Sequence, residues 1–116
     1  MNKAERISKA LKFLERKGYR LGFTSPKRGV DLLLFHDSAP KTVIFVAVMP
    51  LKGKAFPMQP FGKTVERMRR FKSLVAGSKM WFNEVGWTSN ARYDAVTISD
   101  NEQIDHIENA GRKELR

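Results

Sequence analysis

The residue best placed to do chemistry in this chain is Asp31, a carboxylate at the start of an apolar run. Residues 30–35 (Val-Asp-Leu-Leu-Leu-Phe) and 43–49 (Val-Ile-Phe-Val-Ala-Val-Met) are typical of two adjacent buried strands. A carboxylate in this position could bind a divalent cation that activates water for phosphodiester hydrolysis. A magnesium ion held by protein usually needs one or two carboxylates, and a lysine could stabilise the developing charge, but residues 43–49 contain neither an acid nor a lysine. Asp31 is therefore either a relic catalytic ligand or a structural acid bonded to a backbone donor or an arginine.

A second set of candidate residues is positively charged. Contacts to phosphate need only a positive charge on a long side chain, so these residues would bind nucleic acid without sequence preference. The alternative is that a charged run on a helix is its solvated face. The residues that we expect to contact nucleic acid are Lys27, Arg28, Lys52, Lys54, Lys63, Arg67, Arg70 and Lys72.

The positive charge is concentrated in the first part of the chain. The net charge is +10, but residues 1–72 carry +12 (17 basic and 5 acidic groups) and residues 73–116 carry −2 (5 basic and 7 acidic). A positive surface attracts polyanions, of which DNA and RNA are the commonest inside cells. Surface charge that only keeps the protein soluble is the other interpretation.

Composition excludes several classes of protein. The 116 residues contain no cysteine, which excludes disulfides and cysteine-based zinc sites, and their number predicts a single domain over 1–116. No apolar run is long enough to span a membrane, so we expect a cytoplasmic protein without a membrane partner. The glycines form no phosphate-binding pattern. His106 has no partner at metal-ligand spacing and is expected to be an ordinary polar residue.

The hydrophobic pattern predicts an α/β domain with a central mixed sheet flanked by helices. Residues 37–41 have the composition of a turn, so the apolar runs on either side of them predict an antiparallel hairpin. The second run is apolar at almost every position, as in the middle of a sheet, and Pro50 is expected to close it. The expected elements are a helix over 5–17, strands over 19–24, 30–36 and 42–49, a loop over 50–62, a helix from 64, a strand over 92–98 and a helix over 101–110.

This order, α-β-β-β-α-β-α, and the amino-acid sequences of several segments resemble those of the YraN-like family of small bacterial proteins. That family belongs to the restriction-endonuclease-like, or PD-(D/E)XK, superfamily, together with the Holliday-junction resolvases. The resemblance covers nearly the whole chain and implies a restriction-endonuclease-like fold. The segments that carry it are residues 10–20, 29–33 (Gly-Val-Asp-Leu-Leu), 43–49, 61–62 (Phe-Gly) with Lys72, and 92–96 (Arg-Tyr-Asp-Ala-Val).

The departures from the family pattern fall on its functional positions. The family's first-helix glutamate aligns with Ile7, its strand glutamate with Ala47 and its lysine with Met49, which leaves Asp31. We therefore expect a nucleic-acid-binding protein that has lost metal-dependent cleavage and uses no cofactor. One alternative is an active endonuclease with a rearranged site, which would use Mg²⁺. The other is a protein-interaction module, such as a homodimer, built on an apolar surface around Ile7, Ala47 and Met49.

Overall fold

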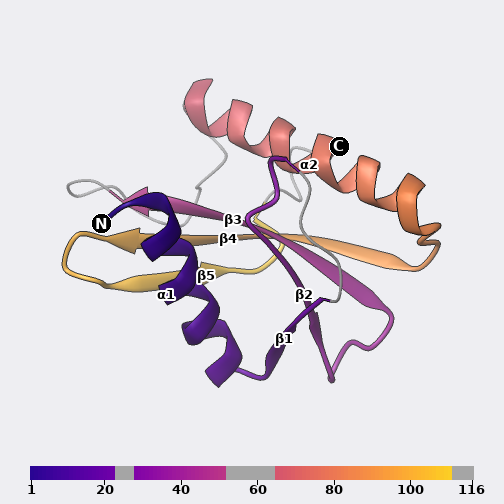
Figure 1. The fold of residues 1–116 in the computed structure, drawn as a ribbon, viewed down its shortest axis with the longest axis horizontal. Helices are drawn as coiled ribbons and strands as arrows, with labels where there is room; N and C mark the ends of the chain where they lie inside the picture. The colour runs from indigo at the N-terminus through magenta and orange to yellow at the C-terminus, as the bar shows by residue number, and fades with distance from the viewer. Residues whose placement is uncertain (23–27, 52–64, 111–116) are drawn as a thin grey trace.

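In the residues that the structure describes, five strands form a mixed sheet with a helix on each face (Figure 1). The computed structural model describes residues 1–22, 28–51 and 65–110, with 65–68 as backbone only. The sheet order is β1-β2-β3-β4-β5, and β3 and β4 are parallel, whereas the other neighbours are antiparallel. The elements are α1 (Lys3–Arg16), β1 (Tyr19–Leu21), β2 (Leu32–His36), β3 (Thr42–Leu51), α2 (Val65–Val85), β4 (Asn90–Ser99) and β5 (Ile104–Ile107).

Helix α1 is bounded by Asn2 before its first residue and by Gly18 shortly after its last. The side chain of Asn2 accepts a hydrogen bond from the backbone N–H of Glu5, which satisfies one of the free donors of the first turn. Gly18 follows the helix with a φ of 93°, a conformation that costs a glycine little because it has no Cβ. The predicted helix over 5–17 is thus confirmed, with its start two residues earlier.

The predicted hairpin is confirmed as β2 and β3. The two strands are antiparallel, with Leu32 opposite Val46 and Leu34 opposite Ile44. Residues 43–48 of β3 are all buried, which is the central position that their apolar pattern predicts. Strand β2 begins at Leu32 instead of residue 30, and the strand predicted over 19–24 is seen as β1 up to Leu21, with residues 23–24 outside the described part.

Helix α2 carries the chain from β3 to the parallel strand β4. Strands β3 and β4 are paired along their full length, from Thr42 opposite Asn90 to Leu51 opposite Ser99. A parallel pair requires a crossover connection, and α2 lies in that connection. Within the described residues no helix is long and apolar enough to cross a membrane.

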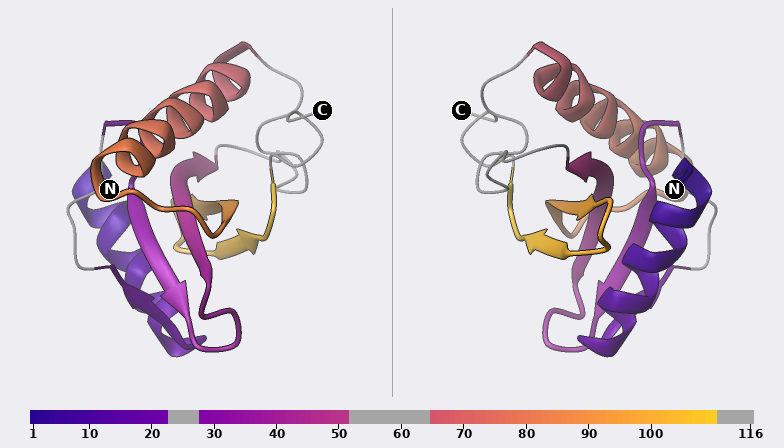
Figure 2. Two further views of the ribbon diagram at one scale, coloured as in Figure 1. Left: turned by 90° about the vertical axis from the view of Figure 1, so that its right-hand side faces the viewer. Right: turned by 90° about the vertical axis from the view of Figure 1, so that its left-hand side faces the viewer.

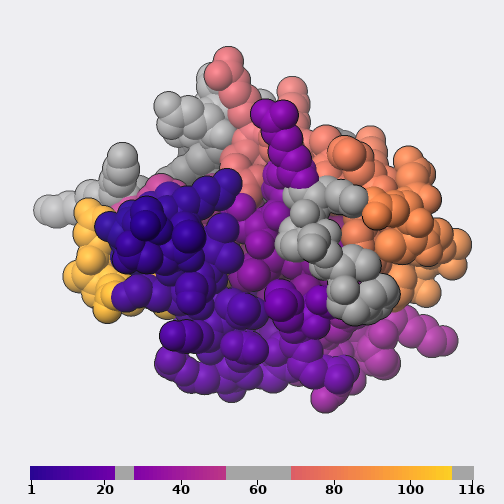
Figure 3. All heavy atoms as spheres, in the orientation of Figure 1, coloured from indigo at the N-terminus to yellow at the C-terminus, as the bar shows by residue number. Residues whose placement is uncertain are grey.

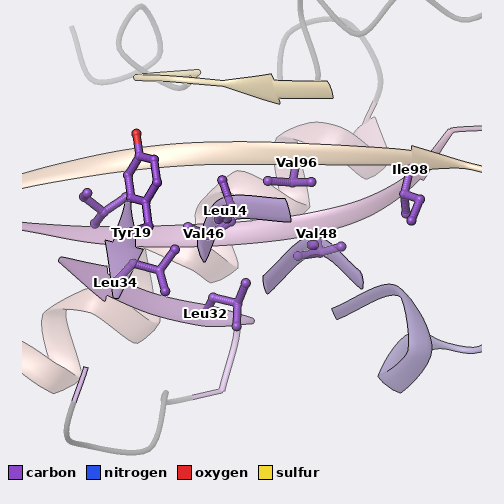
Figure 4. Packing of buried hydrophobic residues seen from close by; sticks show 10 residues of the cluster. Leu14, Tyr19, Leu32, Leu34, Val46, Val48, Val96 and Ile98 are labelled. Carbon is purple, nitrogen blue, oxygen red and sulfur yellow. The ribbon is translucent and has the colours of Figure 1, made fainter. Parts of the chain in front are cut away.

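Each face of the sheet packs against one helix, and Figure 2 shows the strands between α1 and α2. On the α1 face, Leu14 packs with Leu32, Leu34, Val46 and Val96 in an apolar cluster (Figure 4). On the α2 face, Phe71, Leu74 and Trp81 pack on the odd-numbered residues of β3. Alternate residues of β3 therefore serve two different cores.

The helix predicted over 101–110 is wrong, because these residues form β5, antiparallel to β4. The strand follows a tight turn in which the N–H of Ser99 donates to the carbonyl of Gln103, while Glu102 adopts a φ of 65°. Ile104 and Ile107 are three apart, a spacing that suggested one side of a helix. In the structure, Ile104 lies opposite Ile98 and Ile107 opposite Ala95, so the two isoleucines are on different faces of the sheet.

Strand β3 continues to Leu51 and does not close at Pro50 as predicted. Backbone N–H groups alternate between the two sides of a strand, so positions 46, 48 and 50 point towards the β2 side. Because β2 begins opposite Val46, no strand of the described residues pairs with position 50 on that side. A proline fits there, since its missing N–H removes no ladder hydrogen bond.

Candidate functional site

Asp31 lies just before β2 with its side chain only 5% exposed. Its Oδ2 accepts a hydrogen bond from the backbone N–H of Val48 at 2.7 Å and another from Nη2 of Arg70 at 2.6 Å. The Lys3 ammonium, which is largely exposed, lies 3.7 Å from Oδ1. The carboxylate thus joins β3 to α2, and its negative charge is balanced by Arg70 and Lys3.

The position of Asp31 follows from the unequal lengths of β2 and β3. Strand β3 extends past the start of β2, so the N–H of Val48 on that side has no strand carbonyl to bind. The carboxylate supplies this acceptor, while the N–H of Asp31 itself donates to the carbonyl of Val46 at 2.9 Å. A buried N–H without a partner costs about 1–3 kcal/mol, so an acid at this position has a structural use.

Among the residues that the structure describes, the side chains needed for a metal centre are not assembled around Asp31. Ala47 is fully buried among the α2-face residues, and Met49 packs against the same cluster. Across residues 1–22, 28–51 and 65–110, no group of three or more histidines or carboxylates is placed to hold a metal ion. Since Asp31 also has Arg70 as its counter-ion, the described residues do not fit the divalent cation that the resemblance implies.

Ile7, Ala47 and Met49 do not form the single apolar surface that was predicted for a protein partner. Ile7 packs against the α1-face cluster, whereas Ala47 and Met49 belong to the α2 face. The three residues are therefore on opposite sides of the sheet, and Ala47 has no exposed surface.

The structure places three of the eight predicted nucleic-acid contacts. Arg28 and Lys72 are exposed. Arg70 is about a quarter exposed, and its guanidinium is engaged by Asp31 and by the carbonyl of Gly29. Arg67 lies in α2, but its side chain is not described. Four further residues lie outside the described residues: Lys27, Lys52, Lys54 and Lys63.

The structure contains a buried ionic cluster around Asp94 that the sequence analysis did not predict. Asp94 in β4 is fully buried, and its carboxylate accepts both Nε and Nη2 of Arg92, Nε2 of His106 and the backbone N–H of Asn109. The same guanidinium donates to the hydroxyl of Tyr19, which in turn donates to Glu108. The prediction that His106 is an ordinary polar residue is wrong, because its side chain is 2% exposed and bonded to Asp94.

His106 bridges Lys17 and Asp94 through its two ring nitrogens. Its Nδ1 is 2.8 Å from the Nζ of Lys17. Its Nε2 is 2.8 Å from Oδ2 of Asp94. Lys17 follows α1, Asp94 is in β4 and His106 is in β5, so this chain of hydrogen bonds joins three parts of the fold.

The electrostatics of the cluster favour its charged form. Burial alone raises the pKa of Asp94, but hydrogen bonds from His106 and Arg92, together with the Arg92 charge, bring it below its ordinary value. Burial lowers the pKa of Arg92, and the contacts with Asp94 more than reverse this, so that it is raised. Burial also raises the pKa of Tyr19, against the opposing effect of Arg92. Asp94 and Arg92 are therefore both charged and form an ion pair.

Two signals in the sequence could have pointed to this cluster. Arg92 and Asp94 are two apart in a predicted strand, so their side chains share one face of the sheet. Their placement in an apolar segment with Ala95, Val96 and Ile98 required a partner for each charge. Comparison of the chain with protein-family models and with curated proteins gives no match.

Proposed function

We propose that this chain binds nucleic acid, DNA or RNA, through a positive surface and does not cleave it. The observation that carries the proposal is the uneven charge, +12 over residues 1–72 and −2 over residues 73–116. Polyanion binding needs clustered positive charge on long side chains, and exposed cations occur on α2 and on the segment before β2.

The arrangement of elements supports a nuclease-derived scaffold of the restriction-endonuclease-like type. Helix α1, the antiparallel strands β1, β2 and β3, helix α2 and the parallel strand β4 follow the order that the YraN-like resemblance implies. The last element differs, since β5 replaces a helix. An acid also stands at the start of β2, where the family pattern has one.

Loss of cleavage is supported by what surrounds that acid. The carboxylate already accepts Val48 N–H and Arg70 on Oδ2, and the Lys3 ammonium lies 3.7 Å from Oδ1, so its charge is balanced by two cations without a metal ion. A magnesium ion held by protein also needs further oxygen ligands, and the neighbouring positions on β3 are the apolar Ala47 and Met49. We expect Asp31 to serve stability, with no part in hydrolysis.

A binding titration tests the first half of the proposal. Fluorescence anisotropy at low salt with labelled duplex, branched and single-stranded DNA and with RNA should give dissociation constants well below about 10⁻⁴ M, the weak limit of non-specific binding. Failure of all probes to bind below that limit would contradict nucleic-acid binding. Light scattering on the same samples would show whether a dimer is the binding species.

A cleavage assay tests the second half. The same probes incubated with Mg²⁺ or Mn²⁺ should remain intact over hours. Cleavage that is abolished by Asp31→Ala, in a variant that still folds, would favour the alternative of an active endonuclease with a rearranged site. Cleavage that persists in the variant would point to a contaminating nuclease.

A further inference from the structure

The segment before β2 is packed unusually closely against α2. We call residues 28–31 the Arg28 turn. Gly29 has a φ of 93°, and a Cβ there would overlap the backbone carbonyl of Ser73. On the helix side, a Cβ at Gly77 would come within 2.5 Å of the Arg28 carbonyl oxygen. Glycine on both partners therefore lets two backbones touch.

Side chains fix the same turn from two further directions. Arg70 of α2 donates Nη1 to the Gly29 carbonyl and Nη2 to Asp31, each at 2.6 Å. Asp31 is bonded to β3 through its carboxylate and its own N–H. The Arg28 turn is thus held by α2 and by β3, and Arg28, whose side chain is exposed, extends from a fixed backbone.

The turn lies at the boundary between the buried and exposed sides of α2. Its contacts on the helix are at 70, 73 and 77, which form one stripe of the helix surface. The stripe one residue later, at 71, 74 and 78, is buried. The stripe one residue earlier, at 69, 72 and 76, is exposed and includes Arg69 and Lys72. Figure 3 shows purple atoms of the segment before β2 at the surface beside the salmon atoms of α2.

We infer that Arg28, together with Arg69 and Lys72 on the exposed stripe of α2, is the main contact with the sugar–phosphate backbone of nucleic acid. This inference rests on the proposed function and names its site. A guanidinium presents a planar set of donors that matches a phosphate. Because the backbone of the Arg28 turn is already fixed, binding orders only the side chain, and less conformational entropy is lost than for a cation on a free segment.

Charge-matched substitutions test this site. Arg28→Gln and Lys12→Gln each remove one positive charge, and Lys12 is an exposed residue of α1, on the other face of the sheet. We expect Arg28→Gln to weaken binding of a duplex DNA probe about 5-fold to 10-fold and to reduce the slope of log K against log salt by about 1. Lys12→Gln should weaken binding less than about 2-fold. Arg69→Gln, on the exposed stripe of α2, should resemble Arg28→Gln in direction with a smaller effect.

The outcomes separate the site from the function. If the unmodified chain binds and Arg28→Gln equals Lys12→Gln, this inference is wrong while the proposed function stands. If the unmodified chain does not bind, the proposed function itself fails. Urea unfolding of each variant checks the fold, and Arg28→Lys, which keeps the charge but not the fork of donors, should bind between Arg28→Gln and the unmodified chain. Equal binding by Arg28→Lys and Arg28→Gln would contradict a role for the positive charge at this position.

Discussion

At the scale of single residues, the sequence and the structure suggest different roles for the carboxylate of Asp31. Its place at the start of an apolar run suggested a catalytic acid, whereas its contacts in the structure are those of a structural acid. The hydrogen bonds to Val48 N–H and Arg70 are made inside the fold, where the side chain is 5% exposed. Such charge-assisted bonds are stronger than neutral ones.

Replacing Asp31 by alanine should lower the free energy of unfolding by about 2 kcal/mol, because Val48 N–H and Arg70 lose their acceptor. Urea denaturation monitored by tryptophan fluorescence measures the change. Asp37→Ala is the control, since that carboxylate is 78% exposed and pairs with an Arg20 side chain that is 68% exposed. Its loss should cost less than about 0.5 kcal/mol. Equal effects of the two substitutions would contradict a structural role for Asp31.

The sequence identified Asp31 but not the partners that decide its role. The sequence alone shows that an acid stands in an apolar run. It therefore allowed both interpretations of Asp31, a relic catalytic ligand or a structural acid. Arg70 is 39 residues away from it, and Lys17 is 89 residues away from His106. Contacts over such separations depend on strand register and helix placement, which local patterns do not contain. For the same reason the Asp94 cluster was not predicted.

At the scale of elements, the Asp94 cluster adds side-chain bonds to the hydrogen-bonded ladders. It links β4 to β5 through His106, and β4 to β1 through Arg92 and Tyr19. Strand β5 has four residues and lies at an edge of the sheet, so its position depends strongly on such contacts.

The cluster should make part of the stability depend on acid pH. The pKa of Asp94 is lower in the folded protein than its ordinary value, so the folded state favours the ionised carboxylate. Its contribution is complete above the unfolded-state pKa, about 3.9, and is lost as the pH falls through the lower folded-state value. Urea unfolding between about pH 2.5 and 6 should show this loss, and Asp94→Asn should remove that part of the slope. The same pH slope in both proteins would contradict this assignment.

Elements with a strong internal period were predicted well. The stripe in α1, the continuous apolar run of β3 and the turn over 37–41 each define their structure locally, and the structure confirms them. Residues 101–110 were predicted as a helix because they contain two isoleucines, Ile104 and Ile107, whose spacing of three fits a helix. The hydrogen bonds between β4 and β5, together with the tight turn at Ser99, determine the strand instead.

At the scale of the whole molecule, the stabilising interactions and the proposed binding interactions differ in kind. The two sides of the sheet are held by apolar clusters with buried side chains. The proposed binding surface consists of exposed cations, whose attraction for phosphate is screened by salt. The two properties should therefore respond differently to ionic strength.

Raising the salt concentration from about 50 to 200 mM should weaken nucleic-acid binding at least about 10-fold, because released counter-ions drive the association. The free energy of unfolding should change by less than about 1 kcal/mol over the same range, since burial of apolar surface contributes most of it. Parallel anisotropy and urea titrations measure both. Affinity that is insensitive to salt would contradict a binding mode based on phosphate contacts.

The unequal lengths of β2 and β3 have a consequence for self-association. Where β3 runs past β2, its flank could serve as a template for a strand from another molecule, the usual hazard of an open sheet edge. An incoming strand would need the N–H groups at 48 and 50. The first is already bonded to the Asp31 carboxylate, and the second does not exist, because residue 50 is a proline. Two consecutive donor positions on this flank are thus closed to a foreign strand, which protects the chain against intermolecular sheet extension there.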